Sequence, residues 1–178
     1  MKFLILVSVL ISVSAASSLR GERVSNLLDE VLKDYDVRVR PNAGVSPTVV
    51  KLSGYAIQVG GYCGKNDDMK VDMYFRQFWN DPRLVLELKS DEKKEEKIKL
   101  GHTFKKDAIW TPDTFFSNSR KGEVVHYPLG QHMIRVEPNG DVLLSERVQV
   151  QAKCGDGSRK WNVGETRTCS LDVESCKY

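Results

Sequence analysis

The sequence has 178 residues, of which 40% are hydrophobic, 8% aromatic and 29% charged, and its formal net charge is +3. Acidic and basic residues are interspersed, and no basic stripe alternates with aromatic residues, which argues against a nucleic-acid-binding protein. The length is sufficient for one domain with a hydrophobic core.

The first sixteen residues have the pattern of a secretory signal peptide. Lys2 precedes the apolar run Phe3–Ile11, and small residues follow up to Ala16, where signal peptidase would cut. The run is shorter than the ~20 apolar residues that a membrane span needs. We therefore predict a signal peptide at residues 1–16 and a secreted or lumenal domain at residues 17–178, with no membrane span in it.

Next in chain order is a short amphipathic helix. Its apolar residues follow the spacing of one helical face: Val24, Leu27, Leu28, Val31 and Leu32. Pro41, Asn42 and Gly44 then predict a loop.

Beyond this loop the pattern is almost entirely that of β-strands. Strand-like runs cover residues 48–59, 69–79, 85–88, 98–102, 123–128, 132–137 and 142–152. Residues 60–67 are predicted to form a turn, and Asn139-Gly140 a tight hairpin, because such turns need positive φ angles. The fold class predicted is all-β, an immunoglobulin-like antiparallel β-sandwich with a short N-terminal α-helix.

Strand alternation gives residues 73–79 two different faces. Tyr74, Arg76 and Phe78 share one face, while Phe75, Gln77 and Trp79 share the other. Since both faces carry rings, we expect one to pack in the core and the other to be covered by a ligand or partner. An arginine beside a tyrosine suits a carboxylate. The alternative is an arginine stacked on tyrosine in a surface ion pair.

The densest aromatic segment is Ile109–Asn118. Its Pro112-Asp113 pair fixes a bend. Trp110 is expected to anchor the edge of the core. Phe115 has two interpretations, as part of the same strand-end cluster or as the wall of a ligand pocket.

Four cysteines follow the signal peptide: Cys63, Cys154, Cys169 and Cys176. An even number in a secreted chain predicts two disulfides, with three possible pairings. Structural zinc is disfavoured, because the cysteine spacings are long and no histidine is near them. No metal or cofactor is predicted. Since the three histidines lack paired-ligand spacing and no nucleophile elbow or phosphate loop occurs, no catalytic residue is predicted and the chain is not expected to be an enzyme.

Four motifs occur in an order that resembles a known family. They lie at Tyr35–Pro41, Tyr74–Leu84, Ile109–Asn118 and Met133–Arg147. Together they resemble the extracellular ligand-binding domain of Cys-loop (pentameric) ligand-gated ion channels, and most closely the anion-channel branch gated by glutamate, glycine or γ-aminobutyrate.

The resemblance implies a pentamer of identical or related subunits, with an amino-acid-type agonist between neighbours. It places Tyr74, Arg76 and Ser145 on the complementary face, with Arg76 and Ser145 holding the agonist carboxylate. Phe115 falls on the principal face. The implied function is the neurotransmitter-binding domain of a chloride channel subunit that supplies mainly the complementary face.

The resemblance also implies a disulfide pairing. In the family, thirteen residues separate the two cysteines of the signature disulfide, whereas twenty-one separate Cys154 from Cys176. Because Ser170–Cys176 resembles the end of that loop, the implied pairs are Cys154 with Cys176 and Cys63 with Cys169.

Members of the family continue beyond this loop into further strands and four membrane spans, whereas this sequence ends at Tyr178. We therefore expect an incomplete sandwich without a pore. The alternative function is a secreted soluble module that sequesters ligand or associates with channel subunits.

Overall fold

The computed structural model describes residues 25–62, 68–85, 98–100, 106–154, 164, 166 and 168–176. The predicted signal peptide and Cys63 lie outside these residues. A helix spans residues 25–32, and no described helix is long and apolar enough to cross a membrane. The strands are β1 (Lys51–Tyr62), β2 (Asp68–Asn80), β3 (Ile98–Leu100), β4 (Thr114–Phe116), β5 (Ser119–Val124), β6 (His132–Val136), β7 (Asp141–Lys153) and β8 (Val173–Ser175). Two 3-10 turns, η1 (Pro82–Leu84) and η2 (Lys106–Ala108), connect them.

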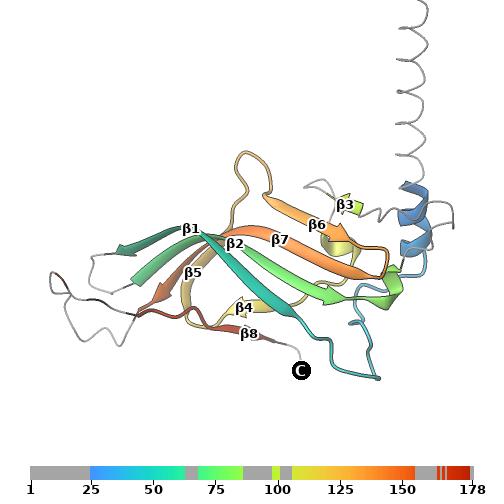
Figure 1. The fold of residues 1–178 in the computed structure, drawn as a ribbon, viewed down its shortest axis with the longest axis horizontal. Coiled ribbons are helices and arrows are strands. Elements are labelled where there is room, and N and C mark those ends of the chain that lie inside the picture. Colours follow the sequence, from blue (N-terminus) through green and yellow to red (C-terminus); the bar gives the residue numbers. More distant parts are fainter. Residues whose placement is uncertain are drawn as a thin grey trace, which may run out of the picture.

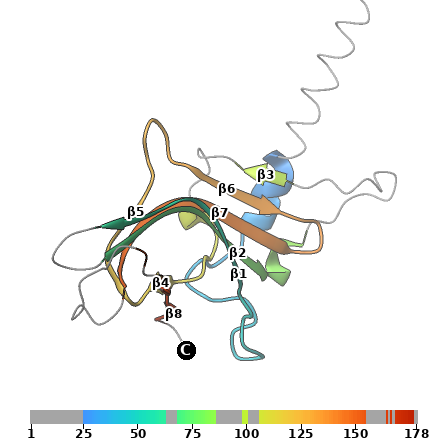
Figure 2. The ribbon, with the colours of Figure 1, turned by 60° about the vertical axis from the view of Figure 1, so that its left-hand side comes forward.

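The strands form two antiparallel sheets, which confirms the predicted β-sandwich. The large sheet has the order β1-β2-β7-β6-β3, with β5 also paired to β7, and β4 pairs with β8 in a second sheet. The small sheet lies on the concave side of the large one, and the helix lies at one end (Figures 1 and 2). β7 is central, because it pairs with all of β2 on one side and with β5 and β6 on the other.

Strand β2 shows the predicted alternation. Its residues Phe75, Gln77 and Trp79 are buried, whereas Tyr74 and Arg76 are only partly buried. The face with Phe75 and Trp79 is therefore the core face. The opposite face of the large sheet, which carries Tyr74 and Arg76, is referred to below as the outer face.

The core has two clusters, one toward each end of the sandwich. In the first, Trp79 and Trp110 meet edge to face at 6.0 Å, and Val31 and Leu32 of the helix pack against the cluster. Trp110 is thus the predicted core anchor, and the helix buries its apolar side as expected. In the second cluster, Phe116 contacts Phe75 at 5.1 Å and joins the small sheet to the large one.

Several strand predictions were wrong. The run at residues 123–128 is mostly loop, since β5 starts at Ser119 and ends at Val124. β1 continues to Tyr62, into the predicted turn. Val85 follows η1 outside any strand, and residues 86–88 lie outside the described part. β4 and β8 were missed because three residues are too few to show a period.

A polar cluster ties three segments together at the helix end. The Asp81 carboxylate is fully buried and accepts hydrogen bonds from the Tyr35 hydroxyl at 2.6 Å and from the Arg83 guanidinium at 2.8 and 2.9 Å. The Trp110 amide donates to the Tyr35 oxygen at 3.0 Å. Burial, followed by the Asp81 hydrogen bond, raises the pKa of Tyr35 well above its usual value, so its hydroxyl stays protonated and donates.

The β6–β7 hairpin closes on this cluster through Gly140. Its φ is +82°, its carbonyl accepts from the Asp81 amide at 2.9 Å, and a Cβ placed on it would lie 2.6 Å from the Asp81 carbonyl oxygen. The predicted hairpin is present, but Asn139 is not among the described residues with positive φ. The loop is therefore one in which only the glycine position is left-handed.

Replacing Gly140 with Ala is expected to lower the free energy of unfolding by about 1–3 kcal/mol. The alanine would have to adopt a left-handed backbone conformation, and its Cβ would clash with the Asp81 backbone. Chemical denaturation measures this loss. Gly60→Ala is the matched control, since nothing lies within 4 Å of its Cβ position. Equal stability of the two variants would contradict the expectation.

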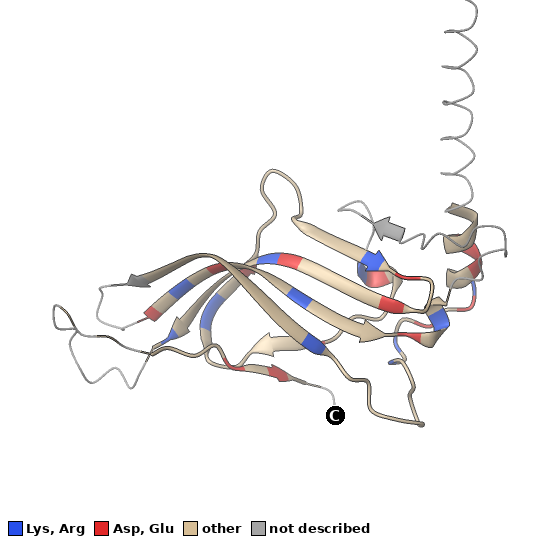
Figure 3. Ribbon diagram, in the orientation of Figure 1, with Lys and Arg blue, Asp and Glu red and all other residues tan. Residues whose placement is uncertain are grey.

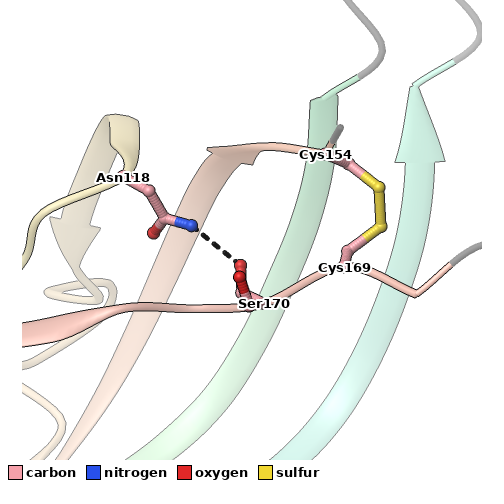
Figure 4. The surroundings of a disulfide bond; sticks show 4 residues. All are labelled: Asn118, Cys154, Cys169 and Ser170. Carbon is pink, nitrogen blue, oxygen red and sulfur yellow. Dashed lines mark hydrogen bonds between the residues drawn. A yellow bond between two sulfur atoms is a disulfide. The ribbon is translucent and has the colours of Figure 1, made fainter. Parts of the chain in front are cut away.

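The disulfide differs from both predicted pairs. Cys154 is joined to Cys169 (Figure 4). Cys176 is free and exposed. The predicted pairs Cys154 with Cys176 and Cys63 with Cys169 are therefore wrong. The sequence separation of 15 between Cys154 and Cys169 is close to the cysteine spacing of the family's signature disulfide. This spacing is a feature of the sequence that points to the observed pair.

Asn118 fixes the segment that follows Cys169. Its side-chain amide donates to the Ser170 carbonyl at 2.9 Å (Figure 4). Its side-chain oxygen accepts from the Asp172 amide at 3.1 Å. The end of the Ile109–Asn118 segment is thereby bound to the chain that leads from the disulfide into β8.

Candidate functional site

The outer face of the large sheet brings three of the four predicted site residues together. Arg76 on β2 lies directly opposite Ser145 on β7, and on its other side it faces Ser53 of β1. Tyr74 occupies the next row along β2, between Tyr55 and Arg147. Directly opposite residues in an antiparallel pair have Cβ atoms about 4.5–5.5 Å apart, so these side chains are neighbours.

Two neighbours from β1 were missed in the sequence. Tyr55 is 61% exposed and stands opposite Tyr74, so that two tyrosines lie side by side next to Arg76. Ser53 adds a hydroxyl on the far side of the guanidinium. The alternation within β1 indicates which residues share a face, but the register across the hairpin also depends on an irregularity between Ala56 and Gln58.

The Arg76 side chain is not committed to another residue. Within the described part of the chain it makes no hydrogen bond and no ion pair. The alternative interpretation from the sequence, a surface ion pair, is therefore not what the described residues form. A partly buried guanidinium with five free donors can bind a carboxylate with two parallel hydrogen bonds.

Arg147, on the same face, behaves in the opposite way. Arg147 binds the Asp72 carboxylate through Nε at 2.9 Å and Nη2 at 2.7 Å, and its Nη1 lies 3.3 Å from the Gln131 side-chain oxygen. This contact, chiefly the hydrogen bonds from Arg147, lowers the pKa of Asp72 and raises that of Arg147. Acidic and basic bands alternate along β2 (Figure 3).

Phe115 lies apart from the other three residues. It belongs to β4 in the small sheet and pairs with Glu174 of β8, whereas Phe116 beside it packs inward on Phe75. Alternation therefore turns Phe115 away from the core, and its side chain is 39% exposed. The chain thus carries two separate surfaces, one around Arg76 and one around Phe115, on different sheets.

Arg76 is only partly buried on the outer face. A hollow of about 290 Å³ on the same face is lined by residues that include Lys70, Asp72, Glu123 and Gln149, but not by Arg76. No group of three or more His, Cys, Asp or Glu side chains among the described residues could hold a metal ion. A small ligand at Arg76 would therefore need a second surface to cover it.

Comparison with known proteins gives an independent result. The model of the neurotransmitter-gated ion-channel ligand binding domain family matches residues 24–178. The chain is also 32% identical, over 158 residues, to the gamma-aminobutyric acid receptor subunit beta-4 of Gallus gallus. The aligned region covers 87% of this chain and 30% of that subunit, so the chain spans about a third of the length of this relative.

Proposed function

The chain belongs to the neurotransmitter-gated ion-channel ligand-binding domain family, and from this premise we propose that it is the extracellular transmitter-binding domain of a chloride channel subunit. Its main contribution is the complementary face of an amino-acid agonist site between subunits. Membership of a family of ligand-binding domains agrees with the prediction that the chain is not an enzyme. The proposed location is extracellular, reached through the secretory pathway, where a disulfide such as Cys154–Cys169 persists.

The observation that carries this proposal is the free guanidinium of Arg76 on an exposed aromatic face. Arg76 lies between the hydroxyl-bearing residues Ser53 and Ser145, and Tyr74 occupies the adjoining row beside Tyr55. These groups supply charge-assisted hydrogen bonds for a carboxylate and an aromatic wall beside it. The related gamma-aminobutyric acid receptor subunit supports a ligand with a carboxylate and an amine.

The separation of the two surfaces supports a pentameric arrangement. Phe115 belongs to the small sheet, whereas Arg76 belongs to the outer face of the large sheet. A head-to-tail ring brings one surface of each copy against a different surface of the next. The partners proposed are therefore further copies of this chain or related subunits, with the ligand held between them.

Arg76→Ala is expected to reduce the affinity for γ-aminobutyrate by about a hundredfold, because the charged partner of the carboxylate is removed. Titration calorimetry on the whole chain measures this affinity, and a thermal melt reports whether the variant folds. Folding should be unchanged, since the Arg76 side chain has no partner among the described residues.

Arg38→Ala is the matched control. Arg38 is an exposed arginine paired with Asp36, in a segment outside the large sheet, and its loss changes the net charge by the same amount. We expect it to leave the affinity unchanged. If Arg76→Ala bound γ-aminobutyrate as tightly as the unmodified chain, Arg76 would not hold the carboxylate and the proposed site would be wrong.

A further inference from the structure

Arg76 and Arg147 lie on neighbouring rows of the β2–β7 pair, on the outer face. Arg76 shares its row with Ser145, Arg147 shares the next row with Tyr74, and Asp72 shares the row after that with Gln149. Arg147 therefore lies between the row of the proposed ligand contact and the row of Asp72. Its long side chain can lean toward either one.

In the structure Arg147 leans away from Arg76. Both of its contacts with Asp72 are short and parallel, and Gln149 donates to the same carboxylate at 3.2 Å. Paired guanidinium and carboxylate groups with this geometry are among the strongest side-chain contacts. Only 13% of the Asp72 side chain is exposed, so water screens the pair incompletely.

Without Asp72, the same side chain could reach the proposed site. Arg147 is the diagonal neighbour of Arg76, and diagonal positions across an antiparallel pair are about 7–8 Å apart, within reach of long side chains. Its guanidinium would then lie over Ser145 beside that of Arg76. Two adjacent cations repel one another, but a ligand with two carboxylates would neutralise both.

We propose that Asp72 sets the ligand class of this face, by holding Arg147 away so that the face accepts one carboxylate rather than two. Asp72 is a positioning residue that acts through Arg147. In the held state a second carboxylate would be desolvated next to Asp72 without a free cation of its own, which is unfavourable. This inference rests on the proposed function.

The test compares γ-aminobutyrate with L-glutamate, which carries one additional carboxylate. Affinities for both are measured by calorimetry on the whole chain, and their ratio is the readout. The unmodified chain is expected to prefer γ-aminobutyrate. Asp72→Asn, which removes the charge and keeps the size, is expected to shift the ratio at least about tenfold toward L-glutamate, corresponding to about 1.4 kcal/mol.

Two further variants separate this mechanism from simpler effects. Asp72→Asn combined with Arg147→Gln should lose the shift, because the released guanidinium is absent. Asp36→Asn makes the same change in net charge at the exposed Arg38 pair and should not shift the ratio. Asp72→Ser has the same expected direction and serves if the asparagine variant does not fold.

The outcomes distinguish the two proposals. If the unmodified chain binds γ-aminobutyrate and Asp72→Asn leaves the ratio unchanged, the role of Asp72 is wrong while the proposed function stands. A shift that persists in Asp72→Asn combined with Arg147→Gln also overturns the role of Asp72. If no variant binds either amino acid, the proposed function fails, and the inference fails with it.

Discussion

Asp81→Ala is expected to lower the free energy of unfolding by about 3–5 kcal/mol, one of the two largest effects on stability anticipated for this chain. The Asp81 carboxylate is completely buried and accepts from Tyr35 and Arg83. Removing it leaves the Tyr35 hydroxyl without its acceptor and a guanidinium that is only 31% exposed without its counter-charge. Such a loss is a large fraction of the stability of a domain of this size.

The measurement is urea denaturation followed by tryptophan fluorescence, since Trp79 and Trp110 lie in the adjacent core cluster. Asp36→Ala is the control, because it also removes an aspartate, but one that forms an exposed pair with Arg38. We expect its unfolding midpoint to stay close to that of the unmodified protein. Similar midpoints for both variants would show that the buried cluster does not stabilise the fold.

The second large effect is expected from the disulfide. Replacing Cys154 and Cys169 together with Ala should cost about 3 kcal/mol, because the bond closes a loop of about fifteen residues. Both cysteines are changed so that neither is left to pair elsewhere. Cys176→Ala is the control and should leave the unfolding midpoint unchanged, since Cys176 is free and exposed.

Peptide mapping without reduction checks the connectivity directly. A linked peptide that contains Cys154 and Cys169 is expected, together with alkylation of Cys176 before any reductant is added. A peptide that links Cys154 to Cys176 would restore the pairing implied by the family resemblance. It would also contradict the structure at this end of the sandwich.

The sequence was most informative where one period dominates a long element. β2 has thirteen residues, and its alternating burial follows from Phe75, Gln77 and Trp79 facing the core. A shift of the strand register by one residue would expose all three side chains, so the pattern determines which face of β2 is buried. The helix at residues 25–32 was found for the same reason, since its apolar residues share one face.

Features that depend on long-range pairing could not be predicted from local patterns. The position of Tyr55 opposite Tyr74 depends on the register of the β1–β2 hairpin, which has an irregularity in β1. The Tyr35–Asp81 hydrogen bond joins residues 46 positions apart. Cysteine pairing is of the same kind, because the sequence shows how many bonds can form but not which thiols meet.

The candidate site was predicted only in part. The residue types at Tyr74 and Arg76 indicated a carboxylate site, and the structure places Ser145 beside them. The contrast between free Arg76 and bound Arg147 depends on which of them reaches an acidic partner. Asp72 and Arg147 are 75 positions apart, and nothing local to either residue predicts the contact.

The complete pairing of β2 with β7 has a consequence for how the protein is made. Asn80 and Asp141, at one end of the pair, are separated by 61 positions. At about 5–20 residues per second, a ribosome needs several seconds to add the intervening chain. During that interval the edge of β2 that pairs with β7 in the folded protein has no partner. A chaperone that shields this edge until β7 emerges would therefore raise the yield of native protein.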